Sequence, residues 1–143
     1  MSKVEGQLIP FKLDPRLAKD CIEITDLDLS RILLMNDIRY PWVILVPRRK
    51  AISEIHHLTL KDQKYLFIEI TKSAEFLEKE FQPSKINIGA IGNIVQQLHI
   101  HIIARNINDP AWPNPVWGHS PPVNYDKDNA NKILEKIVNN FMQ

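Results

Sequence analysis

The stretch that decides the fold is Gln97-Leu98-His99-Ile100-His101-Ile102-Ile103. Polar and apolar side chains alternate along it, which predicts a β-strand from about Val95 to Ala104. Residues two apart in a strand point to the same face, so Gln97, His99 and His101 share one face of the predicted strand. Two imidazoles and an amide aligned along a rigid element indicate a functional site.

Composition restricts the class of protein. The chain has 143 residues, 44% hydrophobic and 24% charged, and we expect residues 1–143 to form a single domain. A formal net charge of +1 gives no overall field that favours nucleic acid or a membrane as partner. The single cysteine, Cys21, is expected to be a buried apolar residue. No signal-peptide pattern opens the chain and no run of about 18 apolar residues follows, so we expect a cytoplasmic protein.

Short apolar segments upstream of the histidines also have the pattern of strands. They alternate with polar residues or form β-branched runs bounded by turn residues. The four further strands are predicted at residues 22–27, 32–35, 42–46 and 86–88. Only the turn from Asn36 to Pro41 separates the second from the third, so these two are expected to pair as a hairpin.

Three helices are predicted from capping residues and near-helical spacing of apolar side chains. Asp14-Pro15 opens a short helix, because an acidic cap followed by proline suits a first turn. Thr59 caps the longest helix, which spans residues 60–81. The last begins at Asp126 or Asp128 and ends near Phe141.

A proline- and tryptophan-rich segment runs from Asp109 to Pro122. Its prolines exclude a helix or a central strand. Trp112 and Trp117 are too apolar to remain in water, so we expect this segment to pack on a surface of the domain or on a partner subunit.

Two other groups of residues, one basic and one a pair of histidines, are not assigned to a site from the sequence. The basic cluster Arg48-Arg49-Lys50 is either a solvated loop or an anion site. His56 and His57 fall outside any periodic polar face, so they are expected on the surface.

The histidine face itself has three interpretations. Buried strand histidines are often structural and hydrogen bonded to their neighbours. A His-x-His pair can also supply two metal ligands, but no third ligand shows a matching pattern, so no metal site is predicted. The third interpretation is nucleophilic catalysis, because a neutral imidazole attacks phosphorus when its second nitrogen holds a proton against a fixed acceptor.

The motif resembles the signature of the histidine triad (HIT) family of nucleotide hydrolases and transferases, His-φ-His-φ-His-φ-φ, where φ is apolar. Gly92-Asn93-Ile94-Val95 before the motif and Ala104-Arg105 after it fit the resemblance, which covers about residues 10–118. The chain is similar to a bacterial-type variant of that family with Gln97 in place of the first histidine. The resemblance implies an α+β fold with an antiparallel sheet of about five strands, one long helix, a C-terminal helix and assembly as a homodimer.

Site roles follow from the resemblance by position. His99 corresponds to the nucleophile that forms a covalent nucleotidyl-histidine on the α-phosphate, and His101 to the histidine that contacts the phosphate. Gln97 would orient His99 through its amide. The remaining positions are expected to bind substrate: Asn87 near the scissile bridge, Asn93 in the phosphate loop, Asp37 or Asn36 on the ribose, and Leu34 and Ile38 beside the base.

The implied function is hydrolysis or transfer of a nucleotidyl group from a dinucleoside polyphosphate or a nucleoside phosphoramidate. No cofactor is required, although Mg²⁺ often accompanies polyphosphates. Gln97 departs from the pattern, and Trp42 and Lys50 also stand where the family frequently has histidine. These departures favour a different substrate or a lowered activity. The alternatives are therefore a catalytically weak or inactive nucleotide-binding or interaction module, and a metal-dependent hydrolase.

Overall fold

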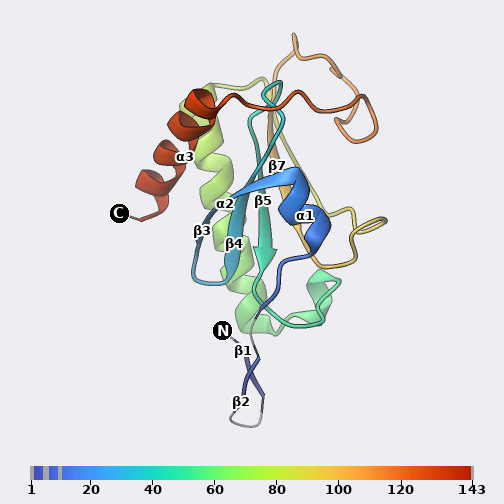
Figure 1. The fold of residues 1–143 in the computed structure, drawn as a ribbon, viewed down its shortest axis with the longest axis vertical. Coiled ribbons are helices and arrows are strands. Elements are labelled where there is room, and N and C mark those ends of the chain that lie inside the picture. The colour runs from blue at the N-terminus through green and yellow to red at the C-terminus, as the bar shows by residue number, and fades with distance from the viewer. Residues whose placement is uncertain (1, 5–6, 10, 143) are drawn as a thin grey trace.

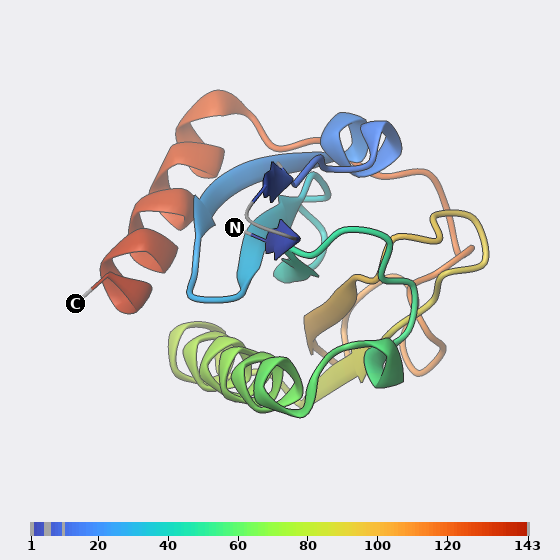
Figure 2. The same ribbon diagram turned by 90° about the horizontal axis from the view of Figure 1, so that it is seen from below.

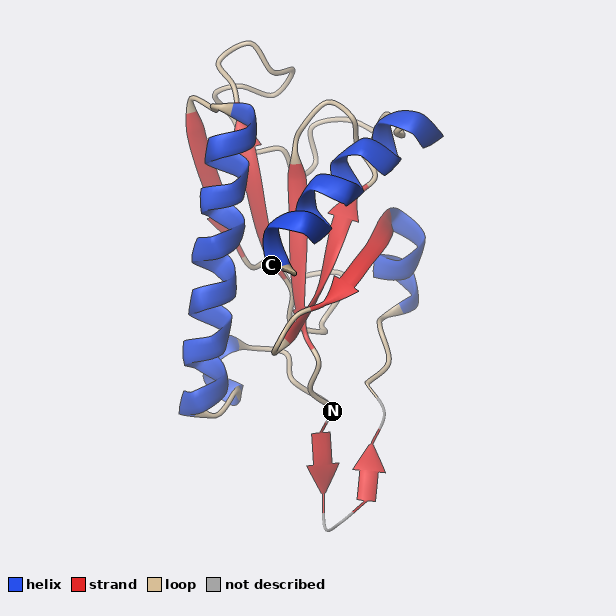
Figure 3. Cartoon of the chain, turned by 90° about the vertical axis from the view of Figure 1, so that its left-hand side faces the viewer, coloured by secondary structure: helices blue, strands red, loops and turns tan. Residues whose placement is uncertain are grey.

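The computed structural model describes residues 2–4, 7–9 and 11–142. Its centre is an antiparallel sheet of five strands in the order β3-β4-β5-β7-β6 (Figures 1 and 3). The bounds are β3 Cys21–Asp26, β4 Ser30–Met35, β5 Trp42–Pro47, β7 Ile100–Arg105 and β6 Lys85–Gly89. Together with the helices, this sheet confirms the expected α+β fold, and β4 and β5 form the predicted hairpin.

A separate hairpin precedes the sheet. Strands β1, Ser2–Val4, and β2, Gln7–Ile9, pair with each other and project away from the five-stranded sheet (Figure 3). Helix α1, Pro15–Asp20, follows, and its cap Asp14 accepts a hydrogen bond from the main-chain amide of Arg16. The predicted cap and proline start are therefore confirmed.

Two longer helices follow the predicted ranges closely. Helix α2 spans Leu60–Phe81, and the hydroxyl of Thr59 caps it by accepting from the Asp62 amide. Helix α3 spans Lys127–Phe141 with Asp126 as its cap. A short 3-10 helix, η1, covers Ile55–His57, and both of its histidines are exposed as expected.

The sheet separates two apolar clusters. Helices α2 and α3 cover one face, where Leu34, Val43 and Ile102 pack with α2 residues such as Leu77 (Figures 2 and 3). The other face carries Leu33, Ile44 and Ile103, which are covered by α1 and by segments before and after β7. Loops rather than long helices thus cover this second face, and His101 lies on it.

The predicted start of the histidine strand was wrong. Strand β7 begins at Ile100, which pairs with Leu45, so Gln97 and His99 precede it. The physical reason is that the Leu98 amide donates to the carbonyl of Ile52, in the segment between β5 and α2, and not to a sheet neighbour.

Candidate functional site

His101 lies on an interior strand, between β5 and β6. It pairs with Ile44 of β5 on one side and with Gly89 of β6 on the other. Trp42 pairs with Ile103, two residues further along β7, so its indole reaches His101 diagonally across the strands. His101 is 4% exposed and His99, just before the strand, is 5% exposed.

The proton arrangement of His99 follows from its partner. Its Nδ1 lies 2.8 Å from the main-chain carbonyl oxygen of Gln97. A carbonyl oxygen only accepts, so Nδ1 carries the proton and donates it to that oxygen. In the neutral ring, Nε2 of His99 therefore carries a free lone pair, which is the arrangement that a nucleophilic imidazole needs.

His101 has the opposite arrangement. The indole nitrogen Nε1 of Trp42 lies 2.9 Å from its Nδ1. An indole N–H only donates, so Nδ1 accepts and the proton of the neutral ring lies on Nε2. Burial, with a smaller contribution from neighbouring His99, lowers the pKa of His101 from 6.5 to about 3. His101 is therefore neutral at physiological pH.

Aromatic rings surround the pair. The His99 and His101 rings meet edge to face with centroids 4.9 Å apart, and Trp117 lies 5.3 Å from His101 and 6.4 Å from Trp42. Gly89 makes room for this tryptophan, because a Cβ at that position would lie 3.3 Å from its ring. The expected packing of the proline- and tryptophan-rich segment is thus confirmed, and it takes place on the histidines themselves.

The sequence suggested that the side-chain amide of Gln97 orients His99, but in the structure this amide has other partners. The side-chain oxygen accepts from the Asp14 amide at 2.8 Å, and the side-chain nitrogen donates to the Lys12 carbonyl at 2.9 Å. The amide thus ties the segment before α1 to the histidine loop. Orientation of His99 comes from the main-chain carbonyl of residue 97, which any side chain at this position would leave in place.

Asn87 lies on the histidine face of β6 but is directed to another partner. It pairs with Ile103, and its side-chain oxygen accepts from Arg105 at 2.9 Å. Arg105 is 1% exposed and also forms an ion pair of 2.7 Å with Asp109. Asn87 therefore belongs to a buried polar network beside the histidines, at the opposite end of β7 from His99.

The residues expected to bind ribose lie in the turn before β5, where they make contacts within the fold. The turn from Asn36 lies at the Arg105 end of β7, where Pro41 O accepts from the Ala104 amide. Asn36 accepts from the Tyr125 amide, and Asp37 forms an ion pair with Arg39. Both therefore fix the turn and the chain that leads to α3.

Leu34 needs correction as a base-flanking residue, whereas the role expected of Ile38 stays a prediction. Leu34 is fully buried in the cluster under α2, on the face of the sheet opposite to His101. Both neighbours of this strand residue are apolar, so the sequence carried no signal of which face it takes. Ile38 is 40% exposed and lines a surface depression with Tyr125 and α3 residues.

The connector between β6 and β7 carries the remaining predicted site residue. Asn93 is exposed on this loop, six residues before His99. Gly92 lets the loop turn tightly, since a Cβ there would lie 3.3 Å from the carbonyl oxygen of Val95. The structure thus leaves Asn93 accessible to a ligand.

The two arginines of the basic cluster make structural contacts. Arg49 forms a paired contact with Asp62 of α2, and Arg48 donates to the carbonyl of Asp28. Among the described residues, no group of three or more His, Cys, Asp or Glu side chains is arranged to hold a metal ion. Cys21 is buried, and burial together with the charge of Asp20 raises its pKa to about 12, which does not suit a nucleophile.

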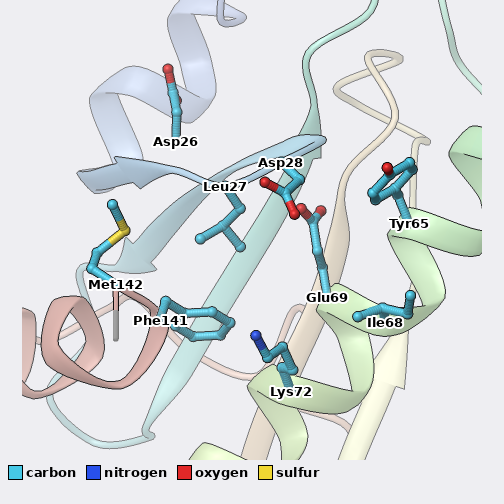
Figure 4. A pocket seen from close by; sticks show the side chains of 9 residues that line it. All are labelled: Asp26, Leu27, Asp28, Tyr65, Ile68, Glu69, Lys72, Phe141 and Met142. Carbon is cyan, nitrogen blue, oxygen red and sulfur yellow. The ribbon is translucent and has the colours of Figure 1, made fainter.

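A surface pocket lies away from the histidines, between the β3–β4 turn, α2 and the end of α3 (Figure 4). Its buried carboxylate, Glu69, accepts from the amides of Leu29 and Ser30. Burial outweighs these bonds and raises the pKa of Glu69. This carboxylate therefore holds the β3–β4 turn.

Sequence reasoning missed the role of two tryptophans at the site. Trp42 lies in a β-branched and aromatic run that predicts only a strand, and Trp117 is 16 residues beyond His101. The only signals were the resemblance, in which histidine is frequent at position 42, and the expectation that the tryptophans pack on a surface.

Fold and site together define an α+β domain with a buried pair of histidines at the start of a central strand. The sequence matches the HIT domain family over residues 16–108. Three solved structures resemble the chain closely. A histidine triad protein from Bradyrhizobium japonicum is 40% identical, with a TM-score of 0.91 over 93% of this chain and 99% of that one.

A histidine triad (HIT) protein from Sinorhizobium meliloti is 46% identical, with a TM-score of 0.88 over 91% of this chain and 96% of that one. A histidine triad protein from Marinobacter aquaeolei is 42% identical, with a TM-score of 0.91 over 94% of this chain and 98% of that one. The search of curated proteins found no match. The chain belongs to the HIT domain family, which supports a nucleotide-binding, hydrolase or transferase module.

Proposed function

We propose that the protein is a nucleotidyl hydrolase or transferase that acts at the α-phosphate of a nucleotide through a covalent nucleotidyl-His99. One observation carries this proposal: Nδ1–H of His99 donates to the Gln97 carbonyl, which leaves the Nε2 lone pair free. The same carbonyl stabilises the positive charge that develops on the ring when Nε2 bonds to phosphorus.

The reaction then has two steps. Nε2 of His99 attacks the α-phosphorus, the bond to the bridging atom breaks, and the leaving group departs with the electron pair. Water next attacks the same phosphorus, the N–P bond breaks, and the electron pair returns to Nε2. Water's proton passes to solvent, and a nucleoside monophosphate is released. His101 contributes its Nε2–H to a phosphoryl oxygen in both steps.

The substrates proposed are dinucleoside polyphosphates and nucleoside phosphoramidates. Asn93 is proposed to bind phosphate from the exposed connector, since its amide can donate to a phosphoryl oxygen. We propose that no cofactor is needed by the protein and that Mg²⁺ enters, where present, on the polyphosphate.

Assembly and location are proposals as well. Strand β6 is an edge of the sheet and exposes 53% of Ile88, which supports pairing with a second copy as a homodimer. Sedimentation of wild type against Ile88→Lys tests this. A cytoplasmic location is supported by Cys21, the only cysteine in the sequence. None of the helices described is long and apolar enough to cross a membrane.

The test is turnover by His99→Ala against a panel of dinucleoside polyphosphates and phosphoramidates. We expect loss of about 10³-fold or more in kcat with an unchanged fold, because the nucleophile is absent. His119→Ala is the matched control, since His119 is exposed and its ring is hydrogen bonded to the side chain of Ser120. Rapid quenching with α-phosphate-labelled substrate should trap acid-labile label on wild type. Undiminished activity of His99→Ala would overturn the proposal.

A second candidate is a nucleotide-binding module without catalysis. The observation that favours it is burial, because His99 and His101 are only 5% and 4% exposed. A phosphoryl group therefore reaches Nε2 of His99 only at the small exposed part of the ring, or after the side chains that cover the ring move. Binding of mononucleotides with no turnover across the whole panel would favour this candidate.

A further inference from the structure

His101 is held between two indoles. Trp42 donates to its Nδ1 at 2.9 Å, and the ring of Trp117 lies 5.3 Å away on another side. His99 is the only titratable group among the rings that contact His101. The residues paired with it in the sheet, Ile44 and Gly89, carry no charge.

We propose that Trp42 is a positioning residue that holds His101 neutral with its proton on Nε2, so that the site favours leaving groups that depart as anions. The part of this inference that concerns substrates rests on the proposed function. It makes phosphoanhydrides, here the dinucleoside polyphosphates, the preferred substrate class, and phosphoramidates the poorer one.

Geometry carries the first part of the argument. A protonated His101 would place an N–H on Nδ1, which would face the indole N–H across 2.9 Å. Two donors cannot share that contact, and an indole has no second atom that accepts. A histidine or carboxylate at position 42 could reverse the bond and accept, whereas tryptophan cannot. The indole thus opposes both the charged ring and the Nδ1–H tautomer.

The choice of leaving group follows from proton balance. When Nε2 of His99 displaces a phosphate from the α-phosphorus, the P–O bond breaks and the electron pair stays on an anion that is stable in water. When it displaces an amine, the P–N bond breaks and the nitrogen must gain a proton as it leaves, because an amine anion is too basic. A neutral His101 stabilises the phosphoryl oxygens through Nε2–H but is a poor acid for that nitrogen.

The proton arrangement is tested by NMR on protein with ¹⁵N-labelled histidine, without substrate. Wild type should show His101 with Nε2 protonated and Nδ1 unprotonated, unchanged down to about pH 5. Trp42→Phe should raise the titration of His101 or mix its tautomers. Trp117→Phe is the matched control. It also replaces an indole by a phenyl ring beside His101 but removes no hydrogen bond to His101, so the Nε2–H tautomer should remain. A wild-type His101 that is charged at pH 6 or protonated on Nδ1 overturns the proposal, whether or not the variants fold.

The substrate arm compares kcat/KM for diadenosine tetraphosphate and an adenosine phosphoramidate. Wild type should favour the anhydride by about 100-fold or more, the lower range of what a general acid contributes. Trp42→His, which can accept from Nδ1–H, should reduce this ratio about tenfold. Equal cleavage of both substrates by wild type overturns the proposal. Full activity in His99→Ala would instead overturn the nucleophile assignment and leave the NMR result standing.

Discussion

The side-chain oxygen of Gln97 accepts a hydrogen bond of 2.8 Å from the main-chain amide of Asp14, 83 residues earlier in the chain. The nitrogen of the same amide reaches the carbonyl of Lys12. The residue that departs from the histidine triad pattern is thus a tie between the segment before α1 and the loop that positions His99. Its side chain makes structural contacts, and its carbonyl accepts from Nδ1–H of His99.

Gln97→Ala is therefore expected to lower stability more than turnover. Loss of the two hydrogen bonds should cost about 1–2 kcal/mol in the free energy of unfolding. The carbonyl of residue 97 remains, so kcat should stay within a few-fold, and Gln97→His should not raise it. Urea denaturation and steady-state kinetics measure both, with exposed Gln96→Ala as the control. A large loss of kcat at unchanged stability would show that the amide acts on the reaction.

His101 makes the stability of the fold depend on pH. Burial lowers its pKa from 6.5 to about 3 in the folded protein, so between these values the unfolded chain binds a proton that the folded one does not. The free energy of unfolding should therefore be highest above pH 6.5 and fall as the pH falls, by about 2–3 kcal/mol at pH 4.5. Denaturation curves of wild type and His101→Gln across this range measure the effect. An equal pH dependence in both would assign it to other groups.

Local signals in the sequence were sufficient for most elements of the fold. Thr59 and Asp126 each place an oxygen on the first free amides of a helix, which depends only on neighbours three residues away. The β4–β5 hairpin was also predicted correctly, because only a short turn separates its two strands. The start of β7 was not, because the bond of the Leu98 amide to Ile52 joins residues 46 positions apart.

The histidines could be selected from the sequence, but their partners could not. Alternation shows that His99 and His101 differ from their apolar neighbours, whereas the contact of Trp42 with His101 depends on strand register. Asp37 is a similar case. The resemblance implied a role on the ribose by position, whereas its contacts with Arg39 and the amide of Val123 are seen only in the folded chain.

Asp109 should be among the most destabilising positions to truncate. It is paired with Arg105, which is 1% exposed and lies against the rings of Tyr40 and Trp112. Burial raises the pKa of Asp109, but hydrogen bonds from Arg105 and main-chain amides outweigh it, so the carboxylate is ionised.

Asp109→Ala leaves the buried guanidinium unpaired and should cost about 3–5 kcal/mol in thermal or urea unfolding. The matched control is Glu80→Ala, which removes the partner of exposed Lys136 and should cost less than about 1 kcal/mol. Similar costs for the two variants would mean that the buried pair is compensated by the remaining hydrogen bonds of Arg105.

The two indoles beside His101 should differ sharply in what their N–H groups contribute. The N–H of Trp42 satisfies the buried Nδ1 of His101, whereas the buried N–H of Trp117 has no partner among the described residues. Trp42→Phe should therefore destabilise the fold by about 1–3 kcal/mol beyond the packing lost with the ring, because it leaves a buried acceptor unsatisfied. Trp117→Phe loses comparable ring area but removes an unsatisfied donor, so beyond the packing lost its free energy of unfolding should change by less than about 1 kcal/mol. Chemical denaturation of both variants at pH 7.5, where His101 is neutral in either state, makes the comparison. If Trp117→Phe proved the more costly, its indole nitrogen would have an acceptor that forms in solution.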